Sequence, residues 1–130
     1  MYSDLVQSYY KTPVHNIPPP KVMVSRHEGN SVCGDHITVY LQIVDDIITD
    51  WWFDGDTSMI TTAAAGFFGD LVIWKSIESV LSWWESTMID EGFEVSSRRR
   101  RARVIALMAT HNAIHQYQKT DTIVRFEDLL

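Results

Sequence analysis

The sequence of 130 residues contains one cysteine, Cys33, and no run of 18 consecutive apolar residues. A single thiol excludes an internal disulfide and any zinc site built only from cysteines of this chain. The missing apolar run argues against a membrane-spanning helix, which needs about 20 such residues. The first residues lack the basic and apolar regions of a secretory signal, so we expect a cytoplasmic protein.

Positive charge is also scarce, and it is unevenly distributed. The net charge of -6 argues against general nucleic-acid binding, yet five of the eleven basic residues lie within residues 98–103. Cations at the start of a helix oppose its dipole and repel one another. We therefore expect this cluster to bind an acidic partner or an anion, and the alternative is a solvated first helical turn. Its members are Arg98, Arg99, Arg100, Arg101 and Arg103.

The hydrophobic content of 45% is enough for a buried core, and we expect a single domain over residues 1–130. Residues 3–11 predict a short helix with Ser3 as its N-cap. Period-two alternation over residues 21–55, with a tight turn at Asp45-Asp46, predicts three antiparallel strands, the third over residues 47–53. Because helices follow these strands, we expect an α+β fold with an N-terminal helix and the C-terminal helices packed on one face of the sheet.

Helical spacing dominates after residue 55. Trp74, Trp84 and other apolar residues fall on one stripe that predicts a helix ending at Gly92, with Glu85 among the residues that face away from the core. Residues 97–119 predict a last long helix. Residues 56–71 have no clear pattern, but their small side chains suit close helix packing. The pairs Trp51-Trp52 and Trp83-Trp84 should each direct one indole inward and leave the other more exposed.

Cys33 lies between glycines, two residues before Asp35. This pattern suggests a turn that presents a thiol and a carboxylate together, and the plain alternative is an inert thiol beside a capping aspartate. His111 and His115 share a helix face at i, i+4, and we favour packing or solvated roles for both. An enzyme is the least supported class, because the sequence has no base–nucleophile pair and no phosphate loop.

Six segments match, in order, the motifs of one family. They are residues 2–13, 29–35, 48–55, 59–65, 75–80 and 103–106. On these residues the chain resembles the U-type iron-sulfur cluster assembly scaffolds, which include NifU-like N-terminal domains, IscU and SufU. Residues 29–35 are the most specific, since they follow the family pattern Gly-Asn-Pro-x-Cys-Gly-Asp with Ser31 in place of proline. Trp74 stands where the family has glycine.

The resemblance implies the IscU/NifU-N fold and a site in which three thiolates and an aspartate hold a nascent cluster or a zinc ion. Two of the three family cysteines are absent here. The second falls on Ser58 in the SufU-like register or Asp56 in the IscU-like register, and the third falls on Ala106. The implied metal ligands are therefore Cys33, Asp35, Asp56 and Ser58, a degenerate set.

Two hypotheses stay open. In the first, the chain is a divergent scaffold that binds iron, zinc or a shared iron-sulfur cluster, with a second protomer or an external thiol completing the ligands. In the second, it has lost cluster chemistry and acts as a protein-binding module, with no cofactor. The resemblance implies a cysteine desulfurase or another assembly protein as the partner, and leaves a homodimer open.

Overall fold

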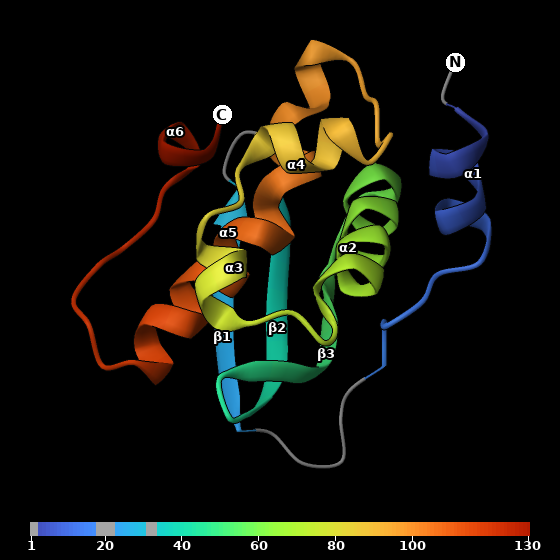
Figure 1. Cartoon of the computed structure of the whole chain (residues 1–130). Helices are drawn as coiled ribbons and strands as arrows, with labels where there is room; N and C mark the ends of the chain where they lie inside the picture. Colours follow the sequence, from blue (N-terminus) through green and yellow to red (C-terminus); the bar gives the residue numbers. More distant parts are fainter. Residues whose placement is uncertain (1–2, 18–22, 31–33) are drawn as a thin grey trace.

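The computed structural model describes residues 3–17, 23–30 and 34–130. The three consecutive prolines at residues 18–20, which by sequence favour an extended segment, and the signature residues Ser31, Val32 and Cys33 lie outside the described residues. Figure 1 shows the elements, whose order and bounds are α1 Asp4–Lys11, β1 Val24–Asn30, β2 Asp35–Val44, β3 Ile47–Asp56, α2 Met59–Val72, α3 Ile77–Leu81, α4 Glu85–Asp90, the 3-10 helix η1 Ser97–Arg99, α5 Arg100–Tyr117 and α6 Phe126–Leu129.

The three strands form one antiparallel sheet in the order β1-β2-β3, which confirms the predicted meander. Asp45 and Asp46 both have positive φ, 52° and 61°, as a two-residue hairpin turn requires. Strand β3 runs three residues past the predicted end at Phe53. Gly55 permits this extension, because a Cβ there would lie 2.1 Å from the backbone oxygen of His36 on the neighbouring strand.

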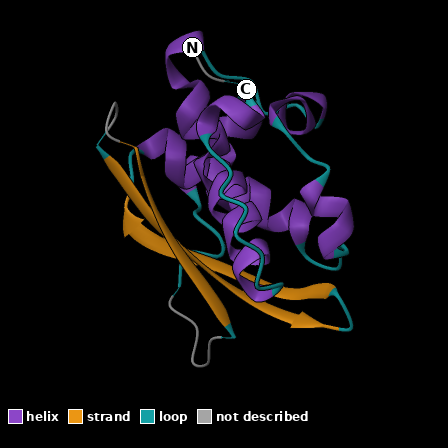
Figure 2. Cartoon of the chain, turned by 90° about the vertical axis from the view of Figure 1, so that its left-hand side faces the viewer, coloured by secondary structure: helices purple, strands orange, loops and turns teal. Residues whose placement is uncertain are grey.

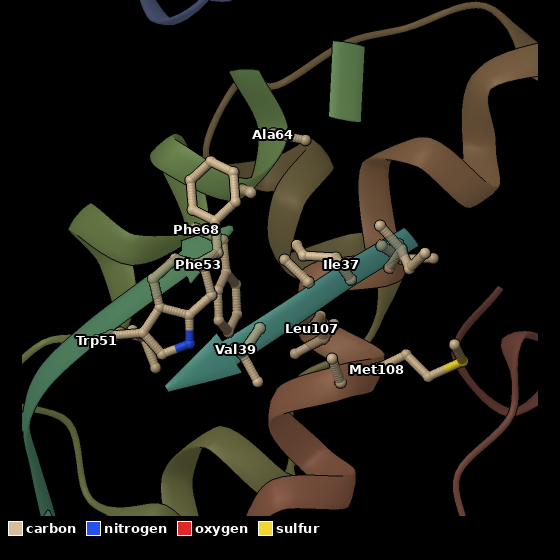
Figure 3. Packing of buried hydrophobic residues seen from close by; sticks show 14 of the residues in the cluster. Ile37, Val39, Trp51, Phe53, Ala64, Phe68, Leu107 and Met108 are labelled. Carbon is tan, nitrogen blue, oxygen red and sulfur yellow. The ribbon is translucent and has the colours of Figure 1, made fainter. Parts of the chain in front are cut away.

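The helices lie on one side of the sheet, as Figure 2 shows, and the α+β class is confirmed. Alternate residues of β2 are buried under α5, so the period-two pattern of the sequence reflects one covered face. Figure 3 shows how the core side chains from β2, β3, α2 and α5 meet. They include Ile37, Val39, Trp51, Phe53, Ala64, Phe68, Leu107 and Met108.

Helix α1 begins as predicted, with the Ser3 hydroxyl accepting a hydrogen bond from the Val6 backbone N–H. The helix packs on α2. Two glycines of α2 permit the chain after α1 to pass close to it. A Cβ on Gly66 would lie 3.2 Å from Val14, and one on Gly69 would lie 2.5 Å from the His15 ring. The prediction of close packing at the small residues of this segment is therefore confirmed.

The predicted single helix over residues 74–88 is wrong. The segment contains two short helices, α3 and α4, separated at Ser82, Trp83 and Trp84. Trp74 is 71% exposed and Trp84 is 52% exposed, so neither belongs to a buried stripe. None of the helices in the described residues combines the length and the hydrophobicity that a membrane span needs.

The predicted outward orientation of Glu85 is also wrong, because its side chain is buried. Its carboxylate accepts two hydrogen bonds from the Arg100 guanidinium, at 2.9 and 2.6 Å, and one from Arg103 at 2.6 Å. Hydrogen bonding from Arg100, with a further contribution from Arg103, lowers the pKa of Glu85 from its ordinary value near 4.5 to about 2. This ion pair fixes α4 against the start of α5, the long helix that the sequence predicted.

Candidate functional site

Asp35 is the first residue of β2, and its carboxylate is directed toward the N-terminus of α2. The Oδ1 atom accepts a hydrogen bond from the Ser58 backbone N–H at 2.6 Å, and Oδ2 accepts one from the Thr61 hydroxyl at 2.6 Å. The side chain is 2% exposed. Both oxygens therefore satisfy donors of the first helical turn, a position in which the helix dipole also favours a negative charge.

Ser58 is the N-cap of α2. Its hydroxyl accepts from the Thr61 backbone N–H at 3.4 Å and donates to the Thr61 hydroxyl at 3.1 Å. The structure thus brings Asp35 and Ser58 together, but it does so through capping contacts. Thr61 completes this arrangement and was missed in the sequence, where the spacing of Ser58 and Thr61 gave the only hint of a helix start.

The other predicted ligand positions differ in their surroundings. Asp56 ends β3 opposite His36 and is exposed, whereas Ala106 is buried in α5 among core residues. Cys33 lies outside the described residues. Among those that are described, no three histidine, cysteine, aspartate or glutamate side chains group together as a metal site would require.

The five arginines of the cluster divide into three groups. Arg103 is buried and Arg100 is paired with Glu85, so these two join α4 to α5. Arg101 lies over the Phe126 ring at 4.9 Å from its centroid. Arg98 and Arg99, in η1, are exposed. Sequence alone did not separate these roles, because the acidic partner Glu85 is 15 residues away from the nearest of the two paired arginines.

An apolar groove of about 150 Å³ lies between α1 and α2, and Tyr10, Lys11 and Met59 are among its lining residues. A second hollow of similar size is lined by Ser58, Met59 and Arg99. Because Met59 borders both, the surface is continuous from the α1 groove to the arginines of η1. Met59 is 53% exposed. This surface, which we call the α1–η1 surface, therefore places apolar and basic groups beside the capping residue Ser58.

The two histidines of α5 have packing and surface roles, as the sequence favoured. His111 is buried, and its Nε2–H donates to the Val80 carbonyl at 2.8 Å. Burial lowers the pKa of His111 to about 4. His115 is half-buried and contacts the Thr120 hydroxyl at 3.2 Å. Neither imidazole faces the carboxylate of Asp35.

A three-stranded antiparallel sheet covered on one face by helices, with the signature aspartate at the start of its central strand, defines the class of U-type scaffold folds. The chain matches the family model described as NifU-like N terminal domain over residues 1–123. It belongs to that family, which confirms the resemblance seen in the sequence.

Two curated relatives are similar over about two thirds of the chain. The iron-sulfur cluster assembly scaffold protein IscU of Thermotoga maritima is 28% identical over 82 residues, or 63% of this chain and 58% of the relative. The zinc-dependent sulfurtransferase SufU of Bacillus subtilis is 28% identical over 83 residues, which are 63% of this chain and 55% of the relative. The matched part therefore spans little more than half the length of either relative.

Solved structures support the same fold. The N-terminal NifU-like protein from Brucella abortus superposes with a TM-score of 0.75 at 13% identity, covering 90% of this chain and 94% of that one. A putative iron-sulfur cluster assembly scaffold protein of the SUF system from Fervidobacterium islandicum superposes with a TM-score of 0.71 at 18% identity. The match covers 87% of this chain and 96% of that one.

Proposed function

We propose that this chain serves iron-sulfur cluster assembly through protein contacts and does not hold a cluster on its own ligands alone. The observation that carries the proposal is the state of Asp35. Its two oxygens already accept hydrogen bonds from Ser58 and Thr61, and it is buried. Each oxygen keeps a lone pair, but because the carboxylate is buried, a metal ion would reach it only if the first turn of α2 moved away.

The chemistry of the remaining ligand set leads to the same conclusion. Iron-sulfur clusters are held mainly by cysteine thiolates, and the chain has one. Ser58 offers a hard hydroxyl that is engaged as a helix cap, and Ala106 offers no donor atom. These residues do not fit an intramolecular cluster or a tetrahedral zinc ion.

The α1–η1 surface supports the protein-binding part of the proposal. Lys11 and Arg99 place positive charge beside the apolar groove in a chain whose net charge is -6. The complementary occupant is an acidic segment that carries an apolar side chain. We propose that a cysteine desulfurase or another assembly protein supplies it, as the family resemblance implies.

Anaerobic reconstitution with ferrous iron and sulfide tests the ligand argument. The full chain and its Cys33→Ala variant are reconstituted in parallel, and absorbance and bound iron are compared after gel filtration. We expect neither protein to retain a cluster. A cluster retained by the wild type and lost in Cys33→Ala would overturn the proposal, because this protein would then hold a cluster through Cys33 without a partner protein.

Binding to the cysteine desulfurase of the same organism tests the surface. We expect the double variant Arg98→Ser/Arg99→Ser, and separately Met59→Asp, to weaken binding at least tenfold. Lys75→Ser is the matched control, because this exposed lysine follows the opposite end of α2. Equal affinities for all of these proteins would exclude the α1–η1 surface as the docking site.

A further inference from the structure

The helices leave one side of the sheet uncovered, as Figure 2 shows. The burial pattern of β1 and β2 places two exposed histidines on that side, where they face one another. His27 lies in β1 and His36 in β2, at diagonal positions of the antiparallel register. Their rings are stacked, with centroids 5.5 Å apart and an interplanar angle of 15°. This pair could not be predicted from local patterns, because the two residues are nine positions apart and only strand pairing brings them together.

The facing atoms are ring nitrogens. Nδ1 of His36 lies 3.4 Å from Nε2 of His27. Zinc–nitrogen bonds of about 2.0–2.1 Å at a tetrahedral angle separate two ligand nitrogens by about 3.4 Å. The spacing observed here matches that of two imidazole nitrogens around one tetrahedral ion, and it is also the distance of a long N–H···N hydrogen bond between the two rings.

The surroundings hold both rings in place. The other nitrogen of His27, Nδ1, lies 3.0 Å from the Thr38 hydroxyl, an outer contact of the kind that orients metal-binding histidines. Gly29, opposite His36 in the register, leaves room for the second ring. A Cβ at Gly29 would lie 3.1 Å from Nδ1 of His36 and 3.2 Å from its Cε1.

Acidic residues accompany the pair. Asp54 and Asp56 of β3 lie opposite Thr38 and His36 in the register, so both occupy the same side of the sheet as the histidines. Asp54 accepts hydrogen bonds from the Tyr40 hydroxyl, which keeps its carboxylate near β2. Two carboxylates beside two imidazoles attract a cation.

We propose that His27 and His36 bind a divalent transition-metal ion, of which Zn²⁺ is the probe, on the uncovered face of the sheet. The two imidazoles supply two ligands, and water or an external group supplies the others, since the described residues contain no cluster of three donors. The site is separate from Asp35, which is directed to the covered face, and it does not depend on the function proposed above.

Calorimetric titration of ZnCl₂ into the full, metal-stripped chain tests the proposal. We expect one ion per chain, with binding at least tenfold weaker in both His27→Gln and His36→Gln. Gly29→Ala should weaken binding as well, because its methyl group displaces the His36 ring. His115→Gln and Cys33→Ser are the controls, and both should bind like the wild type.

Nuclear magnetic resonance of the imidazole nitrogens provides a second measurement. Zinc should shift Nε2 of His27 and Nδ1 of His36 and leave the nitrogens of His115 unchanged. Absence of zinc binding by the wild type would overturn the proposal, and so would binding that survives both histidine substitutions or that Cys33→Ser abolishes. If the His27 and His36 rings are joined only by a shared proton, the wild type will not bind zinc.

Discussion

The Oδ1 atom of Asp35 lies 2.6 Å from the backbone nitrogen of Ser58, so the first residue of β2 holds the first turn of α2. The two residues are 23 positions apart, and the contact joins the start of the central strand to α2. The signature aspartate therefore has a structural role in this chain, whether or not a metal ion is present.

Substitution of Asp35 should therefore lower stability in the absence of any metal. We expect Asp35→Asn to reduce the free energy of unfolding by about 1–3 kcal/mol, because the loss of charge weakens two buried hydrogen bonds. Urea unfolding in the presence of a chelator measures this change. Asp56→Asn is the control and should stay within about 0.5 kcal/mol of the wild type, since Asp56 is exposed. An unchanged midpoint for Asp35→Asn would show that its capping contacts contribute little.

Removal of the Glu85 charge should destabilise the chain strongly. Glu85→Gln leaves Arg103 as a buried cation without its carboxylate, and breaking such a pair costs about 3–5 kcal/mol. Thermal or urea unfolding measures the loss. Glu78→Gln, an exposed change in α3, is the control. Equal effects of the two substitutions would contradict the role assigned to the ion pair.

The same carboxylate predicts a loss of stability in acid. Its pKa is about 2 in the folded chain and near 4.5 in the unfolded chain. The stabilisation is therefore complete above about pH 4.5 and is lost as the pH falls toward 2, by roughly 3 kcal/mol in total. Unfolding measured from pH 5 to pH 2 should show this slope in the wild type, and Glu85→Gln should show a shallower one.

His111 predicts a further loss of stability as the pH falls, in a pH range above that of Glu85. Its folded pKa is about 4, while an unfolded histidine titrates near 6.5. Between these values the unfolded chain binds one more proton, so the free energy of unfolding decreases as the pH falls from about 6.5 to 4, by roughly 3 kcal/mol. His111→Gln should flatten the slope in this window, and His115→Gln should retain it. A wild-type profile without such a slope would contradict a buried neutral imidazole.

Trp74 should be replaceable by glycine with a gain in stability. Its φ is +70°, a conformation that costs a non-glycine residue about 1–3 kcal/mol, and its indole is mostly exposed. We expect Trp74→Gly to raise the free energy of unfolding by about 1 kcal/mol. Trp74→Ala is the matched control, because alanine keeps most of the strain and should give little gain. A loss of stability in Trp74→Gly would mean that the indole makes a larger packing contribution than its exposure indicates.

Local patterns were sufficient for much of the fold. The Ser3 cap, the Asp45-Asp46 turn and the last long helix each depend on residues within a few positions of one another, and the structure agrees with the sequence there. The family could also be predicted, because its motifs occur along the chain in order. Helical spacing alone failed at residues 74–88, where the chain breaks into α3 and α4.

The sequence by itself determined the α+β class, the family and the shortage of thiol ligands, because each depends on residue types and short-range spacing. Only the tertiary structure decided that Asp35 caps α2, that Glu85 is buried against two arginines and that His27 faces His36. These contacts join residues 9 to 23 positions apart. Strand pairing and helix packing bring such residues together, and no local periodicity records them.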